Sequence, residues 1–160
     1  MTGQSLKRVT RYLIVTLVML STNGYSAAEE SAVTEAMLDN GMKVLVKQDS
    51  RAPVVVAQVW YRIGSSYEPD GITGVSHVLE HMMFKGTKKY PNGDFNRIIA
   101  ENGGRDNAFT GRDYTAYFQT LEKSRLAVSM ELESDRMQGM LLDKDEFAKE
   151  LNVVIEERRM

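Results

Sequence analysis

Residues 74–87 read GVSHVLEHMMFKGT, and both histidines of the 160-residue chain, His77 and His81, lie within this stretch. On an α-helix, residues four apart lie one turn apart on the same face, so the two imidazoles can converge on one ion. At about 100° per residue, Glu80 falls on the same face, and the three side chains span an arc of about 100°. The spacing therefore predicts a helix with a metal-binding face.

The opposite side of this helix is apolar. Val75, Leu79 and Met82 fall together there, while Gly74 and Gly86 bracket the segment as helix punctuation. This pattern predicts a helix that packs one face on a core and turns the other toward a cleft.

A catalytic zinc site needs three protein ligands and one open position, so two histidines leave one ligand to find. The chain has no cysteine and no third histidine, which favours a carboxylate. The last segment, residues 147–160, holds Glu150, Glu156 and Glu157. On a helical wheel, Glu150 and Glu157 lie on the shoulder of an apolar stripe and Glu156 lies on the solvated side, so either of the first two is favoured as the ligand. The stripe consists of Phe147, Leu151, Val154 and Ile155.

The order H-x-x-E-H inverts the zincin motif H-E-x-x-H and is the inverzincin signature. Together with its flanks it resembles the insulinase/pitrilysin family of zinc metallopeptidases, which includes the mitochondrial processing peptidases. The resemblance covers roughly residues 34–160. The segments that carry it are 74–87, Asn102-Gly103-Gly104, Asn107-Ala108-Phe109-Thr110, Asp113-Tyr114-Thr115 and the E-x6-E segment 150–157.

This resemblance implies a zinc-dependent endopeptidase that hydrolyses peptide bonds with a metal-activated water. One Zn²⁺ per chain and a peptide or protein substrate, bound as an extended strand, are implied as well. The implied zinc ligands are His77, His81 and Glu157; Glu80 is the implied general base, Glu150 a carboxylate that orients the ligands, and Asn107 and Ala108 lie on the strand edge that pairs with substrate.

The N-terminus predicts a secretory signal peptide over residues 1–28. Three basic residues, Lys7, Arg8 and Arg11, precede an apolar run from Tyr12 to Leu20, and Ser26-Ala27-Ala28 offers a small-x-small cleavage site. The run falls short of the roughly 20 residues that span a bilayer, and without cysteine no lipid anchor is expected, so no stable membrane anchor is predicted. Secretion or a bacterial periplasm is therefore expected, with a mitochondrial presequence as the alternative.

Residues 29–160 have the size of one domain, expected to be the N-terminal part of a zinc metallopeptidase domain of α+β class, with an antiparallel sheet and helices packed on one face. A net charge of −2 suggests no nucleic-acid partner. The expected elements are a hairpin of residues 32–38 and 42–47 turned at 39–41, a buried strand 53–63, the metal helix, a helix 94–101, a strand 114–121, a helix 123–141 and a last helix from 144. Leu126, Met130, Met137 and Leu141 fall on one side of the helix 123–141, where the methionines are expected to fill the core.

Members of the resembled family are several hundred residues long, so we expect this chain to bind zinc but to have weak or no proteolytic activity alone. Two alternatives stay open. The chain could be a zinc-binding subunit or truncated form that needs a companion peptidase-like subunit or a missing C-terminal half, or a non-catalytic scaffold that keeps a metal for stability.

Overall fold

The computed structural model describes residues 32–160, and the expected signal peptide lies outside the described residues. The chain divides into two compact units, with the boundary between Ser50 and Arg51. Each unit is described by itself below.

The described part of the first unit is a β-hairpin. Strand β1 (Val33–Met37) pairs antiparallel with β2 (Lys43–Lys47) in the register Glu35↔Leu45. The turn between them depends on Gly41, whose φ of 82° favours a residue without a side chain. The expected hairpin is therefore confirmed.

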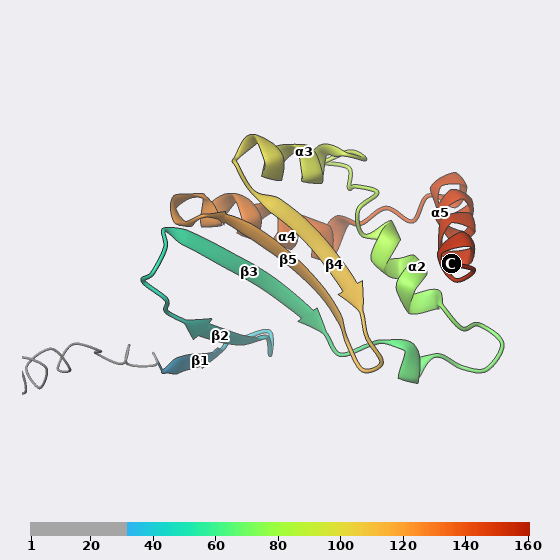
Figure 1. The fold of residues 1–160 in the computed structure, drawn as a ribbon, viewed down its shortest axis with the longest axis horizontal. Helices are drawn as coiled ribbons and strands as arrows, with labels where there is room; N and C mark the ends of the chain where they lie inside the picture. Colours follow the sequence, from blue (N-terminus) through green and yellow to red (C-terminus); the bar gives the residue numbers. More distant parts are fainter. Residues whose placement is uncertain (1–31) are drawn as a thin grey trace, which may run out of the picture. The chain divides into compact units, whose positions relative to one another are not determined.

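The second unit is built around a three-stranded antiparallel sheet of β3 (Val54–Tyr61), β4 (Arg105–Thr110) and β5 (Thr115–Glu122). The strand order is β3-β5-β4, so β5 is the central strand and β4 lies at an edge of the sheet. Helices α3 (Asp94–Glu101) and α4 (Leu126–Gly139) pack on the sheet, and α2 (Val75–Met82) and α5 (Lys144–Glu157) lie side by side at one end of it (Figure 1). Two short 3-10 helices, η1 (Ser65–Tyr67) and η2 (Lys123–Arg125), complete the unit. The expected α+β class with helices on one face of an antiparallel sheet is confirmed.

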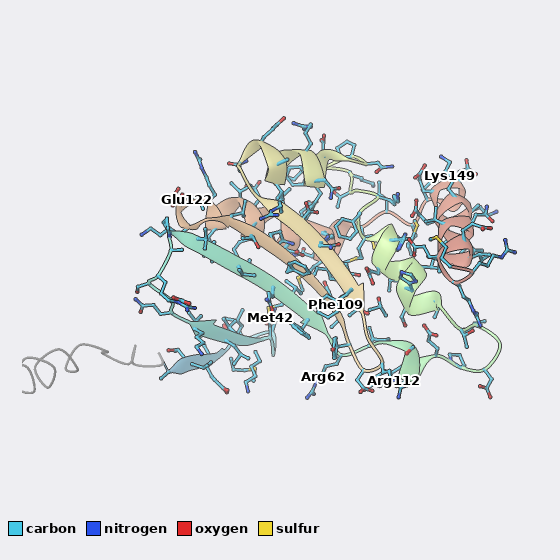
Figure 2. All side chains as sticks on the ribbon, in the orientation of Figure 1. Met42, Arg62, Phe109, Arg112, Glu122 and Lys149 are labelled. Carbon is cyan, nitrogen blue, oxygen red and sulfur yellow. The ribbon has the colours of Figure 1, made fainter. Side chains whose placement is uncertain are left out.

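A strand forms within residues 53–63 as expected, but the expectation that it is buried is wrong. Exposure alternates along β3, so that Ala57 is buried while Val54, Val56 and Trp60 are each more than half exposed. The outer face also carries Phe109 of β4 (Figure 2). Its ring packs edge to face on that of Trp60, with the ring centroids 5.7 Å apart. Helices cover only one face of the sheet in the described residues, and a run of valines does not by itself show that both faces are covered.

Between the sheet and its helices lies an apolar cluster of Phe95, Ile99, Leu121 and Leu132. Helix α4 contributes to it with a face that the sequence analysis did not select, because Met130 and Met137 are exposed. Its buried side consists of Ser129, Leu132, Glu133 and Arg136.

Polar partners explain why this side of α4 is the buried one. Gln119 of the central strand accepts a hydrogen bond from Ser129 Oγ at 2.7 Å and donates to Glu133 Oε1 at 2.6 Å. Arg136 Nε donates to Glu133 Oε2 at 3.2 Å, and its guanidinium lies over the rings of Phe95 and Tyr117. A buried ion pair keeps its charges only when such partners satisfy them.

Among residues 32–160, no helix has the length and apolarity needed to cross a membrane.

Candidate metal centre

Helix α2 presents His77, Glu80 and His81 from two successive turns. His77 Nε2 and His81 Nε2 lie 3.2 Å apart, and the two rings meet edge to face with centroids 4.8 Å apart. Of the expected core positions, Met82 is buried and packs together with Val78, whereas Val75 and Leu79 are exposed. The core-facing side of α2 is therefore rotated from the predicted one, but the two histidines still converge.

Helix α5 reaches the histidines through a small apolar contact. Val78 and Met82 of α2 form a buried cluster with Val154 of α5. Glu150 lies four residues before Val154 and Glu157 three residues after it, so all three share one side of α5. The rest of the predicted stripe is wrong as a buried face, because Phe147, Leu151 and Ile155 are exposed.

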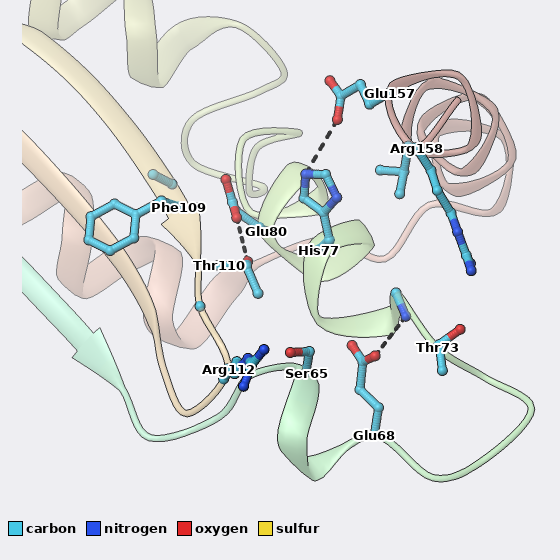
Figure 3. A pocket seen from close by; sticks show the side chains of 14 residues that line it. Ser65, Glu68, Thr73, His77, Glu80, Phe109, Thr110, Arg112, Glu157 and Arg158 are labelled. Atoms are coloured by element: carbon cyan, nitrogen blue, oxygen red, sulfur yellow. Dashed lines mark hydrogen bonds and ion pairs between the residues drawn. The ribbon is translucent and has the colours of Figure 1, made fainter. Parts of the chain in front are cut away.

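The contact of α2 with α5 brings a carboxylate to the imidazole pair. Glu157 Oε2 lies 3.4 Å from His77 Nε2 and 3.7 Å from His81 Nε2 (Figure 3). Among the described residues, His77, His81 and Glu157 form the one group of at least three His, Cys, Asp or Glu side chains that could hold a metal. Four ligands placed tetrahedrally at the zinc distances of about 2.0–2.1 Å are separated by about 3.3–3.4 Å. The observed separations of 3.2, 3.4 and 3.7 Å are close to these edges, so the donor set fits zinc.

Glu150 occupies the other ring nitrogen of His81. Its Oε2 lies 2.9 Å from His81 Nδ1 and its Oε1 lies 2.6 Å from Lys85 Nζ. Because a carboxylate only accepts, Nδ1 carries the proton and Nε2 keeps the lone pair that a metal requires. Burial raises the pKa of Glu150, but the hydrogen bonds from Lys85 and His81 outweigh it and leave the pKa below its usual value. Glu156 lies apart and pairs with Arg159 on the exposed side of the helix.

Glu80 belongs to the same face but not to the ligand group. Its Oε2 accepts a hydrogen bond from Thr110 Oγ1, at the last residue of β4 (Figure 3). One carboxylate oxygen is thereby anchored to the sheet, and Glu80 stands beside the imidazoles.

A cleft of about 840 Å³ opens onto this group of side chains, a volume within the range of ligand sites in proteins. His77, Glu80 and Glu157 line it together with Ala108 and Thr110 of β4. The cleft therefore borders both the candidate metal ligands and the edge strand.

The two residues expected to contact substrate take different positions on β4. Ala108 lines the cleft, whereas Asn107 is exposed and is not among the residues that line it. Asn107 Oδ1 accepts a hydrogen bond from the backbone N–H of Ala108 at 2.9 Å.

Three residues of the site were not selected from the sequence: Lys85, Thr110 and Glu68. Lys85 follows His81 by four residues, a spacing that could have suggested a charge beside the helix. Thr110 lies within a segment quoted for the family resemblance. Glu68 accepts from the backbone N–H groups of Gly74 and Ser76 at the start of α2, and no local pattern marks such a contact.

Comparison with known proteins gives a consistent result. Residues 43–160 match the family described as Insulinase (Peptidase family M16). A zinc protease, PqqE, of Helicobacter pylori is 37% identical over 155 residues, which cover 94% of this chain and 35% of that protein. A probable mitochondrial-processing peptidase subunit beta of Arabidopsis thaliana is 30% identical over 151 residues, covering 94% of this chain and 28% of the relative.

Among solved structures, a protease from Helicobacter pylori superposes with a TM-score of 0.78 at 36% identity. The matched region covers 82% of this chain and 32% of that one. The chain thus spans about a third of the length of the relatives it matches.

Proposed function

Because this chain belongs to the insulinase family, peptidase family M16, we propose that it carries the zinc site of a zinc-dependent endopeptidase. The observation that carries the proposal is the convergence of His77, His81 and Glu157 on one point. A cleft lined by His77, Glu80, Glu157 and residues of the edge strand β4 borders this group. Residues 29–160 would then form the N-terminal part of the peptidase domain.

In this proposal, His77 Nε2, His81 Nε2 and a Glu157 oxygen would hold the zinc. Two imidazoles and one carboxylate are a donor set that suits zinc, and they leave a position open. Zinc bound there would polarise the substrate carbonyl and make a nearby water more acidic. Glu150 holds His81 in the required tautomer from behind, and Lys85 compensates the charge of Glu150.

Glu80 is the proposed general base. It takes a proton from the water that attacks the scissile carbonyl and returns it to the departing amine. Because Thr110 donates to Glu80 Oε2, the other oxygen of the carboxylate is the one left for this transfer. In this proposal, the Thr110 hydroxyl group thus orients the Glu80 carboxylate and leaves its Oε1 to accept the proton.

The substrate in this proposal is a peptide in extended conformation, added to the sheet along β4. An edge strand offers main-chain hydrogen bonds that are largely independent of the substrate's side chains. Ala108 has a small side chain where the cleft meets the strand. Asn107 Oδ1 holds the Ala108 N–H, and an incoming peptide carbonyl would take its place.

Equilibrium dialysis against zinc and a peptide-cleavage assay test the proposal together. We expect about one zinc per chain for the wild type, no retention in His77→Ala, and full retention in Glu80→Gln. In a form with proteolytic activity, Glu80→Gln should abolish cleavage. Cleavage that survives this substitution would contradict the role of Glu80. A chain that keeps zinc but does not cleave even with a companion chain or in a longer form would be a metal-stabilised scaffold.

A second candidate is a zinc-binding subunit or partial form that acts with a companion chain or with the missing C-terminal half. Two observations favour it: one relative is named as a subunit, and the chain spans only about a third of its relatives. Cleavage that appears only after this chain is mixed with a companion peptidase-like protein would support it. Full activity of the purified 160-residue chain would exclude it.

For localisation we propose export after removal of residues 1–28, as in a bacterial periplasmic or secreted protein. The basic and apolar N-terminal pattern supports this, and bacterial zinc proteases occur among the relatives. Because one relative is named as a mitochondrial protein, a mitochondrial location stays as the alternative. N-terminal sequencing of the mature protein should begin at Glu29; an unprocessed chain in the cytosolic fraction would refute export.

A further inference from the structure

The metal helix begins without a capping residue of its own. The N-cap position of α2 is Gly74, with a φ of 96° and no side chain to accept a hydrogen bond. The first backbone N–H groups of any helix lack partners within the helix. In an element of only eight residues, a loose first turn affects half of the helix.

Glu68, six residues before Gly74, supplies the missing acceptors. Its Oε2 accepts from the Gly74 N–H at 2.7 Å, and its Oε1 accepts from the Ser76 N–H at 2.9 Å. Figure 3 shows Glu68 below the start of α2, with His77 on the turn above it. Both carboxylate oxygens are thus engaged with the turn that carries His77.

The backbone that carries Glu68 is itself fixed to the sheet. Ser65 N–H donates to the Gly111 carbonyl at 3.1 Å, and Ser66 N–H donates to the Arg112 carbonyl at 2.8 Å. These carbonyls belong to the turn between β4 and β5, which borders the cleft. Glu68 therefore connects the first turn of the metal helix to the sheet.

The two histidines differ in how their rings are held. His81 Nδ1 is bound by Glu150, but in the described part of the chain no hydrogen bond reaches His77 Nδ1. The direction of the His77 ring thus depends more strongly on its own backbone. His77 directly follows Ser76, whose N–H is held by Glu68.

We propose that Glu68 is a positioning residue of the metal site: by holding the first turn of α2, it sets the place of His77 relative to His81 and Glu157. The inference rests on the proposed zinc site and deepens it. Glu68 also lines the cleft, and its negative charge should itself raise the affinity of the site for a cation. Outer partners of metal ligands are worth about 10–100-fold in affinity, and Glu68 acts through the backbone, so we expect an effect near the lower end.

Glu122 provides a matched control. Its carboxylate also accepts from a backbone N–H, that of Ser124 at 2.9 Å, and it caps η2 at the other end of the sheet from α2 (Figure 2). Glu122→Gln and Glu68→Gln each weaken one carboxylate cap, but only the second lies beside the histidines. A purely structural role would give the two variants the same metal affinity.

The experiment is equilibrium dialysis with zinc alone, at a temperature where circular dichroism shows each variant folded. We expect Glu68→Gln to lower zinc affinity about tenfold and Glu122→Gln to match the wild type, with similar losses of thermal stability in both. Unchanged affinity in Glu68→Gln, or an equal loss in Glu122→Gln, would overturn the inference.

Two further arms keep the test decisive. Should Glu68→Gln not fold, Glu68→Asp keeps the charge but is too short to hold both N–H groups, and it should still lose affinity; wild-type affinity in this variant would overturn the positioning role. A wild-type chain that binds no zinc would defeat the proposed function itself, and this inference with it.

Discussion

Three glutamates of α5, Glu150, Glu156 and Glu157, predict three different outcomes for metal binding. Glu157 contacts the Nε2 side of both histidines, Glu150 contacts the Nδ1 side of His81, and Glu156 contacts Arg159. Glu150 and Glu157 are seven residues apart, which is about 10.5 Å along a helix axis, so neither can take the place of the other. Replacing each by glutamine removes the charge while nearly preserving the shape.

The expected magnitudes follow from these contacts. Glu150→Gln weakens the partner of a ligand and should lower zinc affinity about 10–100-fold, or about 1.4–2.8 kcal/mol. Glu157→Gln removes a ligand and should cost more than about 100-fold. Glu156→Gln should leave affinity unchanged, because its side chain is 65% exposed and its ion pair lies at the surface.

Competition between each variant and a chromophoric chelator gives these affinities on one scale. The wild type and Glu156→Gln should coincide, with Glu150→Gln below them and Glu157→Gln lowest. An order in which Glu150→Gln loses more than Glu157→Gln would exchange the two roles. Equal affinities in all three variants would mean that α5 contributes no ligand.

Other consequences can be measured separately. Val154→Ala deletes two buried methyl groups and should cost about 1.6 kcal/mol in urea unfolding, together with a loss of zinc affinity. Thr110→Val removes the hydrogen bond to Glu80, so cleavage in an active form should fall about tenfold or more while zinc affinity holds and Thr110→Ser recovers the rate. Hydrogen bonds from backbone N–H groups lower the pKa of Glu68, so its contribution to metal-free stability is present above the usual glutamate pKa of about 4.3 and is lost as pH falls through the lower folded value. The urea midpoint should therefore drop on acidification, and less steeply in Glu68→Gln.

The sequence predicted correctly those elements whose ends are set by residues adjacent to them in the chain. Helix α3 begins and ends at the expected residues, because Asp94 opens it and the Asn102-Gly103-Gly104 sequence closes it. The first hairpin follows from Asn40-Gly41 in the same way. In both cases the residues that stop the element are adjacent to it in sequence.

Strand β4 shows the limit of such signals. Its sequence, RDNAFT, lacks the apolar alternation of a strand, and periodicity did not select it; only the family resemblance pointed to a strand edge there. Its pairing partner is β5, reached through the short turn from Gly111 to Tyr114. The strand depends on cross-strand pairing, which a single segment does not encode.

At the site, spacing along one helix was enough for His77 and His81, because i and i+4 fix their geometry before any tertiary contact forms. Spacing left Glu150 and Glu157 open, and only the family resemblance implied Glu157; their different positions depend on the packing of Val154 on Val78 and Met82. The helical wheel placed both glutamates correctly on the side of Val154 but could not tell which end of that side faces Nε2. That information lies in the crossing of α2 and α5.

Helix α4 shows why a wheel can select the wrong face. A helical wheel separates an apolar side of the helix from a polar side, and the polar side is then expected to face water. In α4 the inner side holds Glu133 and Arg136, each at most 3% exposed, because Gln119 and aromatic rings satisfy them. One of those rings is Phe84, just after the metal helix, so the guanidinium also connects α4 to the site. Polar partners can thus outweigh an apolar stripe in choosing the buried face, and these partners lie on other elements.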